Sequence, residues 1–372
     1  MDLSLNEEQS MIQEMARKFA ITELMPAAEQ LDKQNDRKAL LANLKKLAGL
    51  GFMGINIDAA YGGTEAGSVA FSLAITEIAR GCASTAVTTS VTNMVAEVIQ
   101  AVGNEAQKSQ YLPKICSGEY SAGAFCLTEV SAGSDPSAMK TTATENGDEW
   151  VLNGTKQFIT SGEYAGVFVV WAVTDKTLPK GRGISCFLVE ANTSGMTIGK
   201  AEKKMGQHAS STNEVRFDNC RIPKEALLGG LNKGYKVAVG ELAGGRIGVG
   251  SMALGIASAA MDFARDYIKE RQQFGQAIAD FQGIQWMLAD TYTELEAARL
   301  LLMNAAYVKE QGQHFGKQAS MAKLYSSEVA NKACYTALQL MGGNGYIADY
   351  PLERHARDVR VTTIYEGSSE IQ

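Results

Sequence analysis

Apolar residues recur at helical spacing through the first third of the chain, and short alternating runs replace them in the middle. A first helix is expected after Asn6, because Gln9 stands three residues on and apolar positions recur from Met11 to Phe19. The same periodicity predicts further helices over residues 37–50, 69–80 and 84–102.

Turn signals then come at short intervals between about residues 121 and 222. Asn146-Gly147 lies between two alternating runs and is a strong hairpin cue, and Asn153-Gly154 and Lys180-Gly181 are expected to be turns. The runs between the turns predict a β domain with strands over residues 140–145, 149–152, 167–173, 184–190 and 213–217.

Long helical periods return after residue 230, over residues 235–271, 281–311 and 317–341, with short joints that favour an antiparallel bundle. Whether this bundle closes within one chain or against other subunits stays open from periodicity alone. The predicted fold class is α+β, with an N-terminal helical domain (1–120), a central β-barrel-like domain (121–225) and a C-terminal four-helix bundle (226–372).

Composition narrows the functional class. Hydrophobic residues make up 45% of the chain and charged residues 20%, as in a globular protein. The net charge of −6 argues against a nucleic-acid partner. The apolar run Val167–Val173 is too short to span a bilayer, no secretory leader is visible, and the cysteines and histidines lack metal-ligand spacing. We therefore expect a cytoplasmic protein with no metal and no membrane insertion.

One glycine pattern is rejected. Residues 49–54 match GxGxxG, the dinucleotide-binding fingerprint, but that fingerprint needs a strand before it and a helix after it. The segment before Gly49 is expected to be helical, so a helix end and a loop explain the glycines better. This argues against a nicotinamide dehydrogenase.

Three other motifs suggest chemistry. Glu366 lies between Tyr365, which can desolvate it toward the pKa of a useful base, and Gly367, which allows a ligand close to the backbone. Residues 126–135 form a small-residue loop with hydroxyls, and residues 339–358 bring glycines after a helix, suited to phosphate oxygens. A solvated turn, ordinary turn chemistry and a glycine helix cap are the respective alternatives.

With these motifs in this order, the chain resembles the acyl-CoA dehydrogenase family, FAD-dependent flavoenzymes of fatty-acyl oxidation, and its short- to medium-chain, butyryl-CoA dehydrogenase-like members. The resemblance covers essentially the whole chain, including Met205-Gly206-Gln207 and the segment Arg271–Gly275. It implies oxidation of an acyl-CoA thioester to the trans-2-enoyl-CoA, an electron-transfer flavoprotein as electron acceptor, and a homotetramer built as a dimer of dimers.

The resemblance also assigns roles to residues. Glu366 matches the catalytic base that takes the α-proton, while flavin N5 takes the β-hydride; some relatives carry the base at the position of Gly245. Four residues match substrate contacts: Ser134, Arg246, Tyr365 and Gly367. The residues that match FAD contacts are Phe125, Leu127, Thr128, Ser134, Phe158, Ile159, Thr160, Arg271, Phe274, Gln282, Gln339, Gly342, Gly343, Ser368 and Glu370.

Several features depart from the family pattern. Ala243 stands where many relatives have an acid, and Thr88, Thr89, Ser90 and Thr92 make the expected pocket floor unusually hydroxylated. Relatives usually run on into another helix beyond the position of Gln372. The identity of the acyl group therefore stays open. Three other functions also stay open: an enoyl-CoA reductase, a dehydrogenase of branched or cyclic acyl-CoA, and a non-catalytic FAD- and CoA-binding protein. So does a location in the mitochondrial matrix after removal of a transit peptide.

Overall fold

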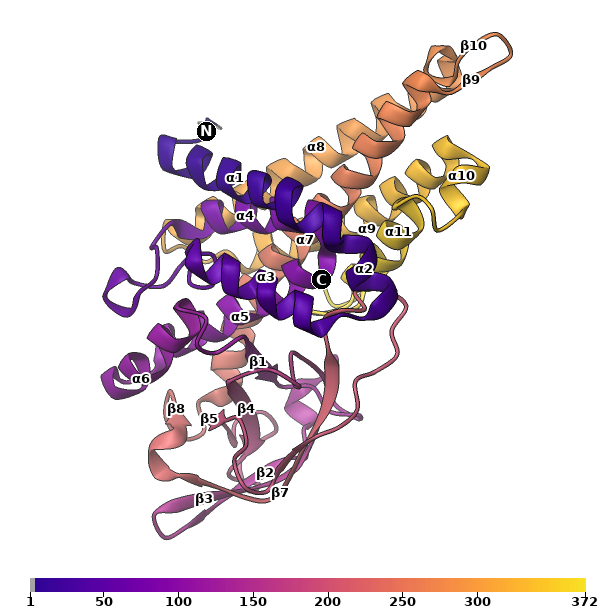
Figure 1. Ribbon diagram of the computed structural model, residues 1–372. Coiled ribbons are helices and arrows are strands. Elements are labelled where there is room, and N and C mark those ends of the chain that lie inside the picture. Colours follow the sequence, from indigo (N-terminus) through magenta and orange to yellow (C-terminus); the bar gives the residue numbers. More distant parts are fainter. Residues whose placement is uncertain (1–3) are drawn as a thin grey trace.

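The computed structural model describes residues 4–372, and its N-terminal part is helical (Figure 1). The predicted capping box is confirmed, because the Gln9 N–H donates to Asn6 Oδ1 at 2.8 Å and the Asn6 N–H donates to Gln9 Oε1 at 3.1 Å. The helices are α1 (Glu7–Phe19), continued by a π-helical turn (Ala20–Leu24), α2 (Met25–Gln34), α3 (Arg37–Gly49), α4 (Gly67–Gly81), α5 (Ala83–Val102) and α6 (Glu105–Cys116). Because α3 ends at Gly49, the rejected glycine pattern follows a helix, as expected.

The middle of the chain forms one eight-stranded sheet. Strand order is β6-β7-β3-β2-β4-β5-β8, and β1 pairs in parallel with β4. The predicted hairpin at Asn146-Gly147 joins β2 to β3. The strands are β1 (Gly123–Cys126), β2 (Thr142–Asn146), β3 (Glu149–Thr160), β4 (Val167–Val173), β5 (Ile184–Glu190), β6 (Met196–Ile198), β7 (Thr212–Pro223) and β8 (Leu227–Leu228).

The turn expected at Asn153-Gly154 was wrong, because β3 continues through it to Thr160. The pairing of β3 with β7 shifts register between Leu152 and Gly154, as at a β-bulge. Gly154 has φ +149, and a Cβ there would lie 2.4 Å from Thr141 Oγ1. The glycine therefore serves a bulge and a close backbone approach within a long strand.

The C-terminal part is built around α7 (Gly234–Glu270), α8 (Gln282–Glu310) and α9 (Gly316–Met341), which confirms the three predicted long helices. The short α11 (Leu352–Arg360) packs against α7 and α9. A two-stranded hairpin, β9 (Gln272–Gln273) and β10 (Gln276–Ala277), joins α7 to α8 and projects away from the rest of the fold, with α10 (Gly343–Tyr346) at the same end (Figure 1).

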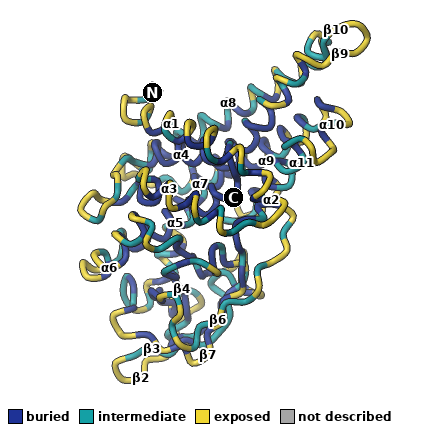
Figure 2. The backbone as a smooth tube through the Cα atoms, viewed as in Figure 1, coloured by how far each residue is buried: buried dark blue, intermediate teal, exposed yellow. Residues whose placement is uncertain are grey.

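Helix α7 is the axis of the fold, and α4, α5, α8 and α9 pack on it. Glycines let its neighbours approach closely: a Cβ at Gly255 would lie 2.1 Å from the Thr76 carbonyl oxygen, and one at Gly248 would lie 2.3 Å from Ser90 Oγ. Within residues 4–372, α7 alone is long and apolar enough to cross a membrane, but 83% of its most apolar window is buried inside the protein. It therefore has the character of a core helix, as its dark central course in Figure 2 illustrates.

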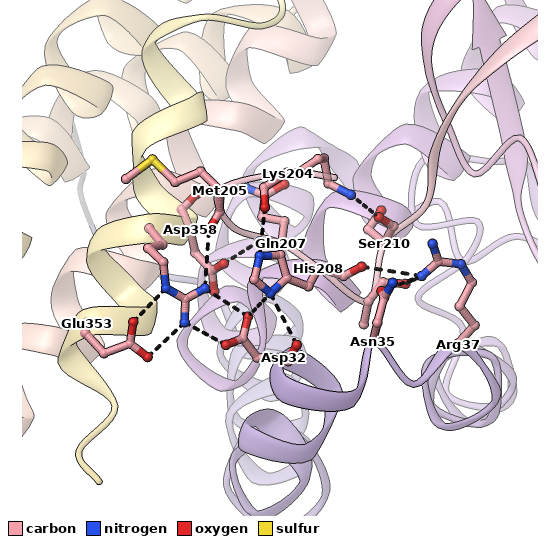
Figure 3. Close-up of polar contacts among 12 residues, drawn as sticks. Asp32, Asn35, Arg37, Lys204, Met205, Gln207, His208, Ser210, Glu353 and Asp358 are labelled. Carbon is pink, nitrogen blue, oxygen red and sulfur yellow. Dashed lines mark hydrogen bonds and ion pairs between the residues drawn. The ribbon is translucent and has the colours of Figure 1, made fainter. Parts of the chain in front are cut away.

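A polar network fastens three distant segments together beside α11 (Figure 3). Asp32, near the end of α2, accepts from Arg357 Nη2 at 2.6 Å and lies 2.9 Å from His208 Nδ1. Gln207 donates its side-chain amide to the Asp358 carbonyl oxygen at 3.0 Å. A Cβ at Gly206 would lie 2.5 Å from the Arg357 backbone, so the loop can lie this close only with glycine.

Candidate active site

Glu366 lies in a tight turn that follows a short 3₁₀ turn, Val361–Thr363. Glu366 and Gly367 both have left-handed backbone conformations, with φ +54 and φ +88. Such a conformation is unfavourable for a glutamate and persists only where the surroundings fix it. Lys323 Nζ donates to the Gly367 carbonyl oxygen at 2.6 Å, and Gln372 Nε2 donates to the Glu366 carbonyl oxygen at 3.0 Å. These two bonds hold the turn.

The Glu366 carboxylate lies against a glycine of α7. A Cβ on Gly245 would be 2.9 Å from Glu366 Oε2 and 2.8 Å from Met94 Sδ. Oε2 is buried and has no hydrogen-bond partner within residues 4–372. A carboxylate oxygen left in this state is poorly solvated and available to a reacting proton.

Two opposing electrostatic effects determine the pKa of Glu366. Burial raises its pKa to about 7, while the positive charges of Arg246 and Lys323 act in the opposite direction. Lys323 is itself fully buried on α9, and burial lowers its pKa to about 8. A carboxyl group with a pKa near neutrality can accept a proton and release it at physiological pH.

Tyr365 connects the turn to the polar network of Figure 3. Its hydroxyl accepts from Gln207 Nε2 at 3.3 Å, and the same amide donates to the Asp358 carbonyl oxygen. Burial raises the pKa of Tyr365, so the hydroxyl stays protonated. Hydrogen bonds through Gln207 thereby connect Tyr365, the residue before Glu366, to the loop that contains Gln207 and to Asp358 of α11.

Arg246 follows Gly245 on α7, and the charges of its guanidinium and of the Glu366 carboxylate act on each other, so it belongs to the same site. Nη1 donates to Ser320 Oγ at 2.9 Å. Nε is buried without an acceptor among the described residues, and burial lowers the pKa of the side chain. A guanidinium with an unused buried donor suits an anionic or carbonyl-bearing ligand.

The sheet contributes a second surface. The Gln157 N–H donates to the Thr128 carbonyl oxygen at 2.9 Å, which places the loop after β1 beside the end of β3. Phe158 has φ +58 and a 63% exposed ring. Behind this surface, Lys156 Nζ lies 2.9 Å from Glu129 Oε1 and donates to the Leu127 carbonyl oxygen at 3.1 Å. Ile159 is buried in β3, and Thr160 ends that strand.

The remaining predicted cofactor residues lie elsewhere. Arg271 and Phe274 are at the projecting hairpin, where the Phe274 side chain is 94% exposed. Asn344 Nδ2 donates to Tyr267 Oη at 2.7 Å, which ties the glycine-rich segment to the same end of α7. Tyr267 and Gly245 are separated by roughly 33 Å of helix, at about 1.5 Å per residue. We call Arg271, Phe274, Gln282, Gln339, Gly342 and Gly343 the distal group. A single chain does not bring it to the Glu366 turn near the C-terminus, since Figure 1 shows β9, β10 and α10 at one end of the molecule, away from the chain end marked C.

Other predicted residues have simple environments. The hydroxyls of Thr88, Thr89 and Thr92 are buried and donate to carbonyl oxygens one turn back on α5, at 2.8–2.9 Å. They are therefore largely used within their own helix. Ser134 is exposed in the loop after β1, Phe125 packs on Trp171 with ring centroids 4.3 Å apart, and Ser368 and Glu370 follow the Glu366 turn.

Sequence reasoning missed two anchors of the turn, Lys323 and Gln372. A lysine at a buried position of a helix is a signal, because burial of an unpaired charge is costly. Its position among apolar residues of α9 could have singled it out. Gln372 carries no comparable signal, since a glutamine in a C-terminal segment is ordinarily solvated.

Comparison with known proteins gives matches over the full length of the chain. Three domain patterns of one family match: acyl-CoA dehydrogenase N-terminal domain (residues 6–119), middle domain (124–220) and C-terminal domain (232–372). Acryloyl-CoA reductase (NADH) of Anaerotignum propionicum is 46% identical over 374 residues, covering 100% of this chain and 94% of that protein.

Solved structures agree. Butyryl-CoA dehydrogenase from Megasphaera elsdenii superposes with a TM-score of 0.96 at 40% identity, covering 100% of this chain and 97% of that one. A chain in the structure of the electron transferring flavoprotein of Acidaminococcus fermentans, described in connection with flavin-based electron bifurcation, superposes with a TM-score of 0.97 at 44% identity, with the same coverage.

The space at Gly245 generates a first prediction. Gly245→Ala places a methyl group 2.9 Å from Glu366 Oε2 and 2.8 Å from Met94 Sδ, closer than these atoms can pack, so we expect it to displace the carboxylate. A misplacement of about 1 Å costs on the order of 10²-fold in rate, and kcat/KM with an acyl-CoA should fall accordingly. The matched control is Gly240→Ala on the same helix, where a Cβ would meet nothing within 4 Å. Equal activity of the two variants would contradict the expectation.

The pKa of Glu366 generates a second prediction. Below pH 7 the carboxyl group is protonated and cannot accept a proton, so kcat/KM for acyl-CoA oxidation should rise with pH and level off above about 7. A pH profile of initial rates over a stable pH range measures this. A midpoint near the ordinary glutamate value of about 4.3 would mean that burial does not control the group.

Proposed function

This chain belongs to the acyl-CoA dehydrogenase family of FAD-dependent CH–CH oxidoreductases, and we propose that it oxidises a short-chain acyl-CoA thioester to the trans-2-enoyl-CoA. One observation carries the proposal. Glu366 combines a buried, unpartnered carboxylate oxygen with a pKa near neutrality, beside the guanidinium of Arg246. These are the properties required of a base that removes a weakly acidic α-proton.

The residues present fit FAD. Phe158 offers an exposed ring in a strained conformation beside Thr128, a surface suited to a flat ring system. Gly342 has φ +57, and a Cβ on Gly342 or Gly343 would meet nothing within 4 Å, so the backbone there is open to a pyrophosphate. FAD, when bound, supplies the acceptor for the β-hydrogen and its electron pair.

The chain's own groups account for the proton chemistry. In the resting site, Arg246 and Lys323 favour the charged carboxylate of Glu366. Within residues 4–372 the Glu366 N–H has no hydrogen-bond acceptor, and the left-handed turn fixes its direction. We assign this N–H to the thioester carbonyl oxygen, which gains negative charge as the α-proton leaves. Base and donor then belong to one residue, so the turn orients both.

The narrow contact between α5 and α7 supports a short acyl group. Met94 lies against Gly245, and one turn further Ser90 Oγ would be 2.3 Å from a Cβ on Gly248. The helices are therefore closed a short distance beyond the Glu366 carboxylate. The similarity to butyryl-CoA dehydrogenase of Megasphaera elsdenii points to the same range.

A second candidate function is the reverse reaction, reduction of a short 2-enoyl-CoA. The 46% identity to the acryloyl-CoA reductase of Anaerotignum propionicum favours it. The two directions share the base, because Glu366 in its protonated form would return the proton to the α-carbon. Rates measured with butyryl-CoA and an artificial acceptor, and with acryloyl-CoA and a reduced donor, distinguish them.

We further propose that the distal group completes the FAD site of a neighbouring subunit in a dimer of dimers. The roughly 33 Å of α7 between Tyr267, which lies at the end of the distal group, and Gly245, which lies against Glu366, supports this, together with the exposed Phe274 ring. The similarity to a chain solved with an electron transferring flavoprotein supports such a protein as redox partner. The domain boundaries and the cytoplasmic location stay predictions.

Glu366→Gln tests the proposed base. The amide keeps the shape of the side chain but cannot accept the proton, so FAD content and acyl-CoA binding should survive. Bleaching of the flavin absorbance by an acyl-CoA should slow by about 10²–10⁴ or more. Stopped-flow absorbance measures the rate, and Glu214→Gln, an exposed acid on β7 outside the predicted site, is the control for a lost charge. A Glu366→Gln enzyme within a few-fold of wild type would refute the assignment.

A mixing experiment tests the shared site. Glu366→Gln subunits keep the distal group, and Phe274→Ala subunits keep the base. If the distal group serves the partner, a co-expressed equal mixture should recover about one quarter of wild-type activity, since half of the dimers hold one intact site. Recovery no greater than the sum of the two separate variants would show that each chain completes its own site.

A further inference from the structure

A second carboxyl group, that of Glu241, lies close enough to Glu366 to be affected by its negative charge. Glu241 stands one helical turn before Gly245, and side chains at this spacing are neighbours on the helix surface. A Cβ on Gly244 would be 3.5 Å from Glu241 Oε1, and a Cβ on Gly245 would be 2.9 Å from Glu366 Oε2. Each of the two consecutive glycines therefore leaves room for one carboxylate, Gly244 for that of Glu241 and Gly245 for that of Glu366.

Charged groups from two other helices converge on the same place. Lys309 of α8 would be 3.2 Å from a Cβ on Gly244, and its Nζ lies 2.5 Å from Glu97 Oε2. Glu97 of α5 also accepts from Asn56 Nδ2 at 2.7 Å. Glu241 itself has no hydrogen bond or ion pair among the described residues, so its carboxylate is free to exchange a proton.

These groups line a cavity of about 870 Å³ between α5, the start of α7 and the end of α8. Its wall also includes the exposed Glu65, so the cavity reaches the surface. Glu241 and Arg246 lie about 140° apart around α7, at about 100° per residue. The cavity is thus reached from a different side of the helix than the site that Arg246 borders.

An α-proton taken by Glu366 must leave before the next turnover. A thioester bound beside Glu366 would cover the substrate side of the carboxylate, whereas Oε2 lies against Gly245 and has no hydrogen-bond partner among the described residues. We propose that Glu241 is the residue that takes the proton from Glu366 and passes it to solvent through this cavity, and that it supplies a proton when the reaction runs in reverse. This proposal rests on the proposed role of Glu366.

The step conserves charge. One water between the two groups accepts the proton from the Glu366 carboxyl and donates one to the Glu241 carboxylate, so one group regains its charge as the other loses it. Burial and the negative charges of Glu97 and Glu366 raise the pKa of Glu241, and Lys309 opposes them. Since the pKa of Glu366 is raised as well, neither group holds the proton strongly against the other.

The test follows proton exchange separately from redox chemistry. The probe is 3-thiabutyryl-CoA, in which sulfur replaces the β-carbon, so no β-hydrogen can be transferred. The holoenzyme is incubated with the probe in D₂O, and NMR measures entry of deuterium at the α-carbon. In Glu241→Gln, Glu366 should return the same proton it removed, and exchange should fall at least about tenfold.

The control is Glu65→Gln, which removes an acid from the same cavity without touching the glycine pair, and it should exchange at the wild-type rate. In Glu241→Gln, first-turnover bleaching of the flavin by butyryl-CoA should stay within about twofold, because that step needs only Glu366. This split between exchange and bleaching distinguishes a proton acceptor from a residue that only supports the fold.

The outcomes are separable. Exchange at the wild-type rate in Glu241→Gln overturns the relay, and so does an equal loss of exchange and first-turnover bleaching, which would indicate a structural effect. Glu366→Gln should exchange no α-proton at all. If Glu366→Gln still exchanges the α-proton, Glu366 is not the base, and the proposed relay fails as well. If exchange is lost in Glu366→Gln but not in Glu241→Gln, Glu366 remains the base and the proposed role of Glu241 is rejected.

Discussion

The close approach of a carboxylate to a helix that carries no side chain at that point is the constraint on which the site depends. Glu366 Oε2 lies only 2.9 Å from the point where a Cβ of Gly245 would be, so a side chain there would push the carboxylate away. Burial without a hydrogen-bond partner disfavours the charged form, and this effect raises the pKa of Glu366. Arg246 and Lys323 limit the rise to about neutrality. Burial and the two cations together, and not burial alone, therefore make the group a usable base.

Such an arrangement needs a rigid turn, because a left-handed glutamate is unfavourable by about 1–3 kcal/mol. Lys323 and Gln372 fix the turn from α9 and from the following segment. Tyr365 fixes it through Gln207, whose loop also contacts α2 and α11 in the network of Figure 3. Segments from all three parts of the chain thus meet within a few residues of the base, which explains why the helical parts and the sheet must pack as one unit.

Much of this could be predicted from the sequence. Periodicity identified the long helices because each buries one continuous apolar face, and the Tyr365-Glu366-Gly367 motif identified the candidate base. The bulge at Gly154 was missed because a glycine in a long strand has the same local signature as a turn. The contributions of Lys323, Glu241 and Lys309 were missed because they arise from contacts between helices far apart in the sequence. Likewise, the distance from the distal group to Glu366 appears only once α7 is known to be one continuous helix from Gly234 to Glu270.

The geometry at Gly245 also explains why a base can stand at either of two places in this fold. The resemblance to the family implies that some members carry the base on the helix at this position, and others in the C-terminal turn. In this chain a side chain at residue 245 would collide with the Glu366 carboxylate itself, 2.9 Å from the Cβ position. The two placements thus bring a carboxylate to the same volume from different backbone segments, and each excludes the other. A glycine on the helix therefore leaves room for the glutamate in the turn, and any side chain at residue 245 would force the Glu366 carboxylate or Met94 to shift.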